Sequence, residues 1–377
     1  MKRIVMLGAL IGTLALTSCV NENEEYYTTH QQNAQKISFV PPVAEKSTRA
    51  WIGDVKDTYP TKEDFSVYGM FHKGSFTKWA AEGNTLYIDN QTCHYDASVE
   101  GWSPWDGADF VNIYWPSGGK LTFAAYSPAR AKNHGTVSYG TTGLQIANFV
   151  VRKSGYAVAA DNTTDTIQYD LMYSERSYDK TSSTGSGSPY SGVDLKFHHA
   201  LSKVTFSAKT SIKAVGAEVR LKKIVLTNVA RKGTFNETIT ENNTTYESAP
   251  AWTLSVPVEK ESEYVVFYSK EGLSLSETKT AVGNNFILLP QDFTAQNDET
   301  QVMTVTWTMK SGAGTPIEQS KTVKLSDIKF TSNTDPEAKW YIGRSYAYNL
   351  SIGMDKIFFN PIVGEDWSAT TGGDITL

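Results

Sequence analysis

The stretch that decides the fold is VDLKFHHALSKVTFSAK, residues 193–209. Apolar and polar side chains alternate around Leu195 and Phe197, and they alternate again around Val204 and Phe206. An extended chain places every second side chain on the same face, so this period of two is typical of a half-buried β-strand. The same alternation recurs at four other places, residues 65–71, 219–226, 302–307 and 346–352.

The rest of the chain agrees with an all-β fold. Segments rich in Gly, Ser, Thr and Asn separate the alternating runs, as at 182–192 and 310–316, and only residues 127–135 suit a single helical turn. Many short strands joined by turns predict β-sandwiches, and the 377 residues favour two in tandem over one. We expect an N-terminal sandwich over 50–205 and a C-terminal sandwich over 206–377. Because the strand pattern runs across the boundary, we expect a rigid junction.

The N-terminus has the pattern of an export signal. Lys2-Arg3 precedes an apolar run from Ile4 to Leu16, which is too short for a helix to cross a hydrocarbon layer of about 30 Å. Ser18-Cys19 then matches a bacterial lipobox. We therefore predict a signal peptide over 1–18, cleavage between Ser18 and Cys19, and a lipid-modified, palmitate-type anchor on the Cys19 thiol in the outer membrane. Each buried methylene of such a lipid contributes about 0.8 kcal/mol to membrane binding.

Composition excludes some partners. The net charge is −5 and no block of Lys and Arg stands out, so a nucleic-acid partner is not expected. Aromatic residues make up 12% of the chain, enough to build a folded core. The chain has 2 cysteines, and use of Cys19 for the lipid leaves Cys93 without a partner for an intrachain disulfide. We expect Cys93 to be a buried core thiol.

No pattern of residues indicates catalysis or a metal site. The histidines lack metal-ligand spacing, and His198-His199 are neighbours on a predicted strand, where adjacent side chains point to opposite faces. Asp106 and Asp109 flank a glycine but lack the rest of a Ca²⁺ loop, so a solvated turn is expected. We therefore predict no enzyme activity, no catalytic residue, no metal and no cofactor.

Tryptophans in a β-sandwich are usually core residues, and we interpret Trp102, Trp105 and Trp115 in this way. Stacking of an exposed indole on a sugar ring is the alternative for each. A glycosidase is less favoured, because it needs two carboxylates about 5–9.5 Å apart in one cleft, which a sequence does not reveal.

Taken together in this order, several short segments resemble the fimbrillin family of Bacteroidetes, the Mfa-like, type V pilin group. They are the lipobox, ISF and TRA at 37–39 and 48–50, FSVYGMF at 65–71, YWPSGGKLTFAAYSP at 114–128, IQYDLMYS at 167–174, the 193–209 stretch, FILLPQDF at 286–293, KWYIGRSYAYNLSIG at 339–353, and Trp367.

The resemblance implies two tandem transthyretin-like β-sandwiches and a specific mode of assembly. In that family a trypsin-like, Arg-specific protease removes an N-terminal strand, and a strand from a neighbouring subunit replaces it. Here it implies cleavage between Arg49 and Ala50, with residues 19–49 as the lipidated leader. Ile37 and Phe39 would fill the groove before cleavage. Lys46 is a competing cleavage site for a less selective protease.

The resemblance also places a donor strand near the C-terminus. Its apolar candidates are Ile357, Phe359, Ile375 and Leu377, and the same residues could instead form the last strand of their own domain. The implied function is that of a structural pilin subunit in adhesive surface fimbriae, with other pilin subunits and a host protein or glycan as partners. The alternatives are a tip or accessory fimbrial adhesin, or a glycan-binding surface lipoprotein.

Overall fold

The computed structural model describes residues 35–40, 59–79, 81–140, 142–151, 169–183, 192–242, 245–255, 260–261, 263–294, 300–328, 330, 338–353 and 357–364. Almost all regular structure in this part is β, which confirms the predicted class. Two short 3-10 turns accompany it, η2 (Ala129–Asn133) and η4 (Leu325–Asp327), and η2 lies where the sequence predicts a single turn. None of the helices in these ranges is long and apolar enough to cross a membrane.

The N-terminal part is built on a nine-stranded sheet with the order β10-β1-β4-β3-β2-β5-β8-β11, in which β9 also pairs with β5. Its strands are β1 (Phe39–Val40), β2 (Phe65–His72), β3 (Thr85–Asp96), β4 (Gly101–Pro104), β5 (Lys120–Ser127), β8 (Met172–Ser174), β9 (Ser177–Lys180), β10 (Val193–Asp194) and β11 (Phe197–His199).

This sheet closes on itself, because its two ends belong to one stretch of chain. Only residues 195–196 separate β10 from β11, and Val193, Leu195 and Phe197 are all buried in the same core. We call residues 193–199 the closure strand. Its first part pairs with β1, and its second part pairs with β8. The strand β1 is therefore the element that completes the ring between β4 and the closure strand.

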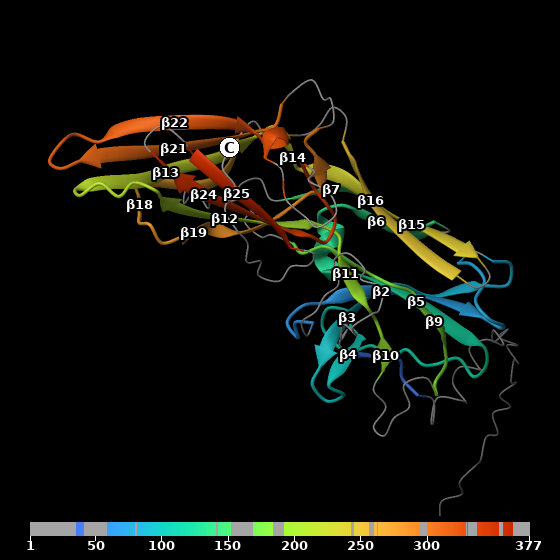
Figure 1. Ribbon diagram of the computed structural model, residues 1–377. Helices are drawn as coiled ribbons and strands as arrows, with labels where there is room; N and C mark the ends of the chain where they lie inside the picture. The colour runs from blue at the N-terminus through green and yellow to red at the C-terminus, as the bar shows by residue number, and fades with distance from the viewer. Residues whose placement is uncertain are drawn as a thin grey trace, which may run out of the picture.

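A second sheet, with the order β16-β15-β7-β6, belongs to the same part of the molecule. Its strands are β6 (Thr136–Gly140), β7 (Gly143–Val150), β15 (Lys232–Asn242) and β16 (Thr245–Leu254), and Figure 1 shows the yellow β15 and β16 alongside β6 and β7. Phe235 and Trp252 pack with Tyr173 and Phe149 in one hydrophobic core.

The predicted division after residue 205 assigns the hairpin over 232–254 to the second sandwich, but in the structure this hairpin packs with the N-terminal part. The physical reason is that β15 pairs with β7 and buries its apolar face against the N-terminal core. Alternation in a sequence fixes which face of a strand is buried, but it does not fix the partner strand.

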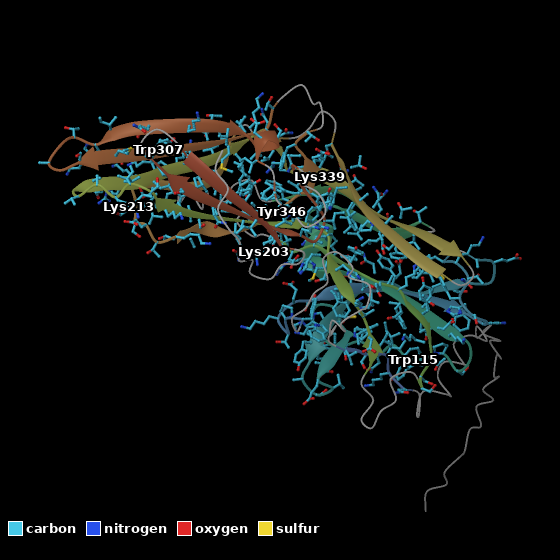
Figure 2. The ribbon with its side chains drawn as sticks, in the orientation of Figure 1. Trp115, Lys203, Lys213, Trp307, Lys339 and Tyr346 are labelled. Atoms are coloured by element: carbon cyan, nitrogen blue, oxygen red, sulfur yellow. The ribbon has the colours of Figure 1, made fainter. Side chains whose placement is uncertain are left out.

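The C-terminal sandwich packs two four-stranded sheets, β19-β12-β24-β25 and β18-β13-β21-β22, at the opposite end of the molecule (Figure 1). Their strands are β12 (Ser202–Thr210), β13 (Ala217–Thr227), β18 (Tyr264–Leu275), β19 (Thr280–Leu288), β21 (Val302–Ser311), β22 (Ile317–Lys324), β24 (Ser345–Ile352) and β25 (Ile357–Gly364). Trp307 and Tyr346 belong to its core, whereas Trp115 lies in the N-terminal part (Figure 2).

Two small two-stranded sheets lie beside the C-terminal sandwich, and hydrogen bonds join the two parts. The small sheets pair β14 (Val229–Ala230) with β17 (Lys260–Glu261), and β20 (Gln291–Asp292) with β23 (Lys339–Trp340). At the junction, the Trp252 indole donates to the Ala200 carbonyl at 2.6 Å, and the Gly343 amide donates to the Leu201 carbonyl at 2.9 Å. Residues 200–201 thus accept hydrogen bonds from both parts of the molecule.

Candidate functional site: the strand position filled by residues 35–40

Residues 35–40, which we call the leader strand, occupy an interior position in the N-terminal sheet. On one side Phe39 lies opposite Trp102 of β4 in antiparallel register, and Lys36 lies opposite Tyr114. On the other side Phe39 and Val40 run parallel to the closure strand at Val193 and Asp194. The leader strand is therefore bonded on both flanks, unlike a strand at a sheet edge.

Three backbone hydrogen bonds outside the named strand ladders fix its position. The Ile37 amide donates to the Ile113 carbonyl at 2.7 Å, and the Trp115 amide donates to the Gln35 carbonyl at 3.0 Å. On the opposite flank, the Val193 amide donates to the Ser38 carbonyl at 2.8 Å. Without the leader strand, β4 and the closure strand would lie about two strand spacings apart, roughly 9–10 Å, too far to bond each other.

Two side chains of the leader strand enter the core. Ile37 is 1% exposed and Phe39 is 0% exposed, whereas the side chain of Lys36 is exposed. The Phe39 ring meets Phe65 and Phe123 edge to face, with centroids 5.8 Å and 5.4 Å away. Burying these two side chains contributes roughly 1.5–3 kcal/mol each.

Tyr59, which follows residues 41–58 in the sequence, is buried in the same core. Its ring stacks on Phe197 of the closure strand at 5.4 Å and meets Trp102 edge to face at 5.3 Å. Its hydroxyl shares a hydrogen bond with Ser127, and burial raises the pKa of Tyr59. Tyr59 is thus anchored to the closure strand and to β4 independently of the leader strand.

Cys93 on β3 lies in this core as well, fully buried and with a free thiol, as its sequence position predicts. It pairs across the sheet with Phe65, one of the two rings that contact Phe39. Burial raises the pKa of the Cys93 thiol well above its usual range. A neutral, enclosed thiol at this position has the properties of a packing residue and lacks those of a nucleophile.

Charged groups also hold the second part of the closure strand, which pairs with β8. The Glu175 carboxylate accepts from Lys196 Nζ at 2.9 Å and from His198 Nε2 at 3.0 Å. Burial raises the pKa of Glu175, but these hydrogen bonds outweigh it, and the pKa lies below its usual range. His199 is paired with Asp170 at 2.9 Å. Both histidines of the doublet are buried, and each faces one of the two carboxylates that flank β8.

Several residues that the sequence singles out lie outside the described part of the chain. They are the proposed lipidation and signal-cleavage residues Ser18 and Cys19, the proposed maturation site Arg49 and Ala50, and the C-terminal residues Ile375 and Leu377. Ile357 and Phe359 belong to β25, which pairs with β24 of its own sandwich over eight residues.

The tryptophan-rich stretch divides into buried and half-exposed positions. Trp102 and Trp115 are buried core residues, as predicted, whereas Trp105 is half-buried. Its ring lies 5.0 Å from His94 and 5.1 Å from Phe110, which is 42% exposed. The signal for this cluster was the mixed WSPWDGADF composition, but the pairing of Trp105 with Phe110 across a tight turn cannot be deduced from it.

The turn beside these rings has the form expected of a solvated turn. The Asp106 carboxylate accepts from the Ala108 and Asp109 amides, both at 2.8 Å, and these hydrogen bonds lower the pKa of Asp106. Within the described ranges, no group of three or more His, Cys, Asp and Glu side chains is placed to hold a metal ion.

One solved structure with a TM-score above 0.5 shares this fold at low sequence identity, and two other structures are more distant. A fimbrial protein from Bacteroides vulgatus is 16% identical, with a TM-score of 0.54, and the match covers 88% of this chain and 99% of that one. A candidate cell adhesion protein from Bacteroides ovatus is 17% identical, with a TM-score of 0.47 and coverages of 90% and 99%. The tip fimbrial protein Mfa3 of Porphyromonas gingivalis is 12% identical, with a TM-score of 0.35 and coverages of 81% and 96%.

No curated protein matches the sequence. A family model does, and it is the model for fimbrillin-like proteins, which matches residues 48–367. The matched range begins just before the proposed cleavage site and includes the C-terminal sandwich and every strand of the N-terminal sheet except β1. Since it spans well over half of the 377 residues, the chain belongs to the fimbrillin-like family.

Proposed function

We propose that this protein is a subunit of adhesive surface fimbriae that is exported as a lipoprotein and assembled by strand exchange. In this account Cys19 carries the lipid anchor in the outer membrane, and a trypsin-like, Arg-specific protease cuts between Arg49 and Ala50. The leader strand then leaves, and a strand from a neighbouring subunit takes its place. Repetition of this contact from head to tail builds an open filament.

The observation that carries the proposal is the interior position of the leader strand. It completes a closed sheet and buries Ile37 and Phe39, yet it joins the rest of the chain only through residues 41–58, which contain Arg49. A single cut in that segment would leave a short strand held by non-covalent contacts alone. Its departure would expose two bonding backbones and an apolar core, which is the requirement for uptake of another strand.

Proteolysis of the full chain tests the maturation step. We expect an Arg-specific protease to give one stable product that begins at Ala50 and to release the fragment that carries Ile37 and Phe39. The Arg49→Ala chain should stay uncut and monomeric, and Lys46→Ala should behave like the parent. Filaments seen by electron microscopy from Arg49→Ala protein would contradict the proposal.

The donor strand is proposed to lie in residues 365–377. Because β25 is already paired with β24, the pairing favours an own-domain role for Ile357 and Phe359 and leaves Ile375 and Leu377 as the donor candidates. The sequence Ile375-Thr376-Leu377 has the same order of side chains as Ile37-Ser38-Phe39, a β-branched residue, a hydroxyl residue and a large apolar residue.

Deletion of residues 368–377 tests the donor assignment. The shortened, protease-treated chain should remain folded and monomeric, and it should still accept a strand from a full-length subunit. Filaments of normal length from the shortened chain alone would rule out this segment as the donor.

A tip or accessory adhesin, or a glycan-binding surface lipoprotein, is the second candidate function. The half-exposed Trp105 beside the exposed Phe110 favours it, because exposed aromatic rings stack on sugars. Binding of purified protein to a panel of immobilised neutral oligosaccharides should then fall in the Trp105→Ala, Phe110→Ala double variant. No binding by the parent protein would count against this candidate.

A further inference from the structure

Two glycines face the backbone of the leader strand from opposite flanks. Gly101 lies in β4, and Gly192 immediately precedes the closure strand. A Cβ atom added to Gly101 would lie 2.7 Å from the Phe39 carbonyl oxygen. One added to Gly192 would lie 3.0 Å from the Phe39 carbonyl carbon and 3.1 Å from its amide nitrogen.

The closest of these approaches are all to the leader strand. The three atoms nearest to a Cβ on Gly192 all belong to Ser38 and Phe39. Of the three atoms nearest to a Cβ on Gly101, two belong to Phe39, and the third is the Val99 carbonyl oxygen at 3.7 Å, an ordinary contact. Gly192 also has φ +88°, which side-chain-bearing residues rarely adopt, whereas Gly101 carries no such constraint. A side chain at 101 would therefore hinder the occupant while leaving the surrounding sheet unstrained.

We propose that Gly101 and Gly192 are the residues that make room for the backbone of a strand in this position, for the leader strand and for the strand that replaces it. Because neither glycine has a Cβ atom, each leaves room for the strand backbone at Ser38 and Phe39. This inference rests on the proposed strand exchange, because only exchange gives the position a second occupant. Its ligand class is an extended peptide strand from another fimbrial subunit.

The neighbouring contacts add two further requirements for the occupant. It must run antiparallel to β4 and parallel to the closure strand, since the register of Phe39 fixes both directions. It must also place apolar side chains two residues apart, as Ile37 and Phe39 do, with the larger one between Phe65 and Phe123. A strand shifted by one residue would turn these side chains away from the core.

A competition experiment on the full chain tests the role of Gly101. A site for a sequence-specific protease replaces residues 43–48, the chain is cut there, and an excess of labelled peptide with the sequence of residues 35–41 is added. The Gly101→Ala chain should lose its leader fragment about tenfold faster or more, because overpacking of this size typically costs 1–3 kcal/mol. The matched control is Gly118→Ala, where an added Cβ meets nothing within 4 Å, and it should match the parent.

Filament assembly of the same chains tests the extension to the incoming strand. We expect Gly101→Ala to assemble at least tenfold more slowly than Gly118→Ala, while hydrogen exchange in β2, β3 and β5 stays as in the parent.

Unchanged release of the leader from Gly101→Ala would overturn the inference, and so would loss of hydrogen-exchange protection in β2, β3 and β5, since the glycine would then serve the body of the sheet. Faster release of the leader fragment from Gly101→Ala, together with filament assembly at the parental rate, would overturn the extension of the inference to strand exchange. If the parent itself forms no filaments, strand exchange fails, and the leader-release measurement still decides whether Gly101 makes room for the leader strand.

Discussion

The leader strand and β25 are the first and last strands of the described chain, and they are held in opposite ways. The leader strand is short, lies inside a sheet and is bonded to β4 on one side and to the closure strand on the other. The strand β25 is longer, lies at the end of the order β19-β12-β24-β25 and pairs with β24 over eight residues.

This contrast shows that a strand in the interior of a sheet need not have a long ladder, and that a strand with a long ladder can lie at the edge. The leader strand completes a closed sheet with few hydrogen bonds and two buried side chains, and so its loss leaves a strand-shaped vacancy with bonding groups on both walls. The strand β25 has a longer ladder, but its loss would simply move the sheet edge to β24. A short interior strand is well suited to replacement, because after it leaves, the unpaired backbone groups on both neighbouring strands still define a site for one strand.

Removal of one core side chain from each strand should give the largest effects. Phe39→Ala is expected to cost about 3–5 kcal/mol in the stability of the N-terminal sheet, because a large buried ring is lost. The matched change in β25, Ile357→Ala, removes a side chain that is 6% exposed and should cost about 2–5 kcal/mol in the C-terminal sandwich.

Hydrogen exchange resolves where each loss occurs. Phe39→Ala should lower protection around β4 and the closure strand, and Ile357→Ala should lower it in β24. Equal loss of protection in both halves from either variant would contradict the separate roles assigned to these two strands.

The closure strand should respond to its carboxylate partner by a smaller amount. Glu175→Gln removes the charge that accepts from Lys196 and His198, which should cost about 1.5–3 kcal/mol at neutral pH. Because the pKa of Glu175 is lowered in the folded chain, its contribution is present above the unfolded value of about 4.3 and is lost as the pH falls through the folded pKa.

Urea unfolding of parent and variant across this range measures the difference. The gap between the two midpoints should close on acidification, and a gap that stays constant with pH would show that the charge of Glu175 is not responsible. Lys223→Met, which removes a partner of the exposed Glu263, is the control and should change stability little.

The junction should show a still smaller effect. Trp252→Phe keeps the ring packing on Phe235 but removes the indole hydrogen bond to the Ala200 carbonyl, which should cost about 0.5–1.5 kcal/mol. Thermal unfolding followed by calorimetry should then show earlier melting of the hairpin over 232–254 together with the N-terminal sheet. Melting of that hairpin with the C-terminal sandwich would contradict its assignment to the N-terminal core.

The smallest energetic effect is expected at the Cys93 thiol. Its reactivity is also the most convenient reporter of whether the leader strand is in place. Burial keeps it protonated in the folded chain, so the intact protein should not react with a thiol reagent at pH 8. Because its pKa is raised, the stability it contributes is present below its unfolded pKa of about 8.5 and is lost as the pH rises toward the folded value. Reaction should become rapid once the leader strand is displaced, and equal rates before and after displacement would contradict an opened core.

The sequence allowed prediction of elements better than of their partners. Alternation at 65–71 and 346–352 predicts strands that the structure has as β2 and β24, because burial of one face imposes a period of two. The inward orientation of Ile37 and Phe39 follows from the same period. The return of the hairpin over 232–254 to β7 does not, because no local pattern encodes which distant strand supplies the next ladder.

Closure of the N-terminal sheet could not be predicted from the sequence either. The run at 193–199 predicts one strand, but its division between two neighbours, β1 and β8, depends on how the whole sheet curves. The importance of Gly101 and Gly192 also emerges only in three dimensions, because nothing in the sequence shows that the leader backbone lies against them.

The most direct test of a replaceable leader strand is to lock it in place. Lys36 and Tyr114 lie opposite each other in an antiparallel bridge, so a Lys36→Cys, Tyr114→Cys pair is within reach of a disulfide, and the buried Cys93 would not compete. After cleavage at Arg49, electron microscopy should show monomers of the oxidised variant and filaments once the disulfide is reduced. Filaments of equal number and length under oxidising conditions would contradict the account.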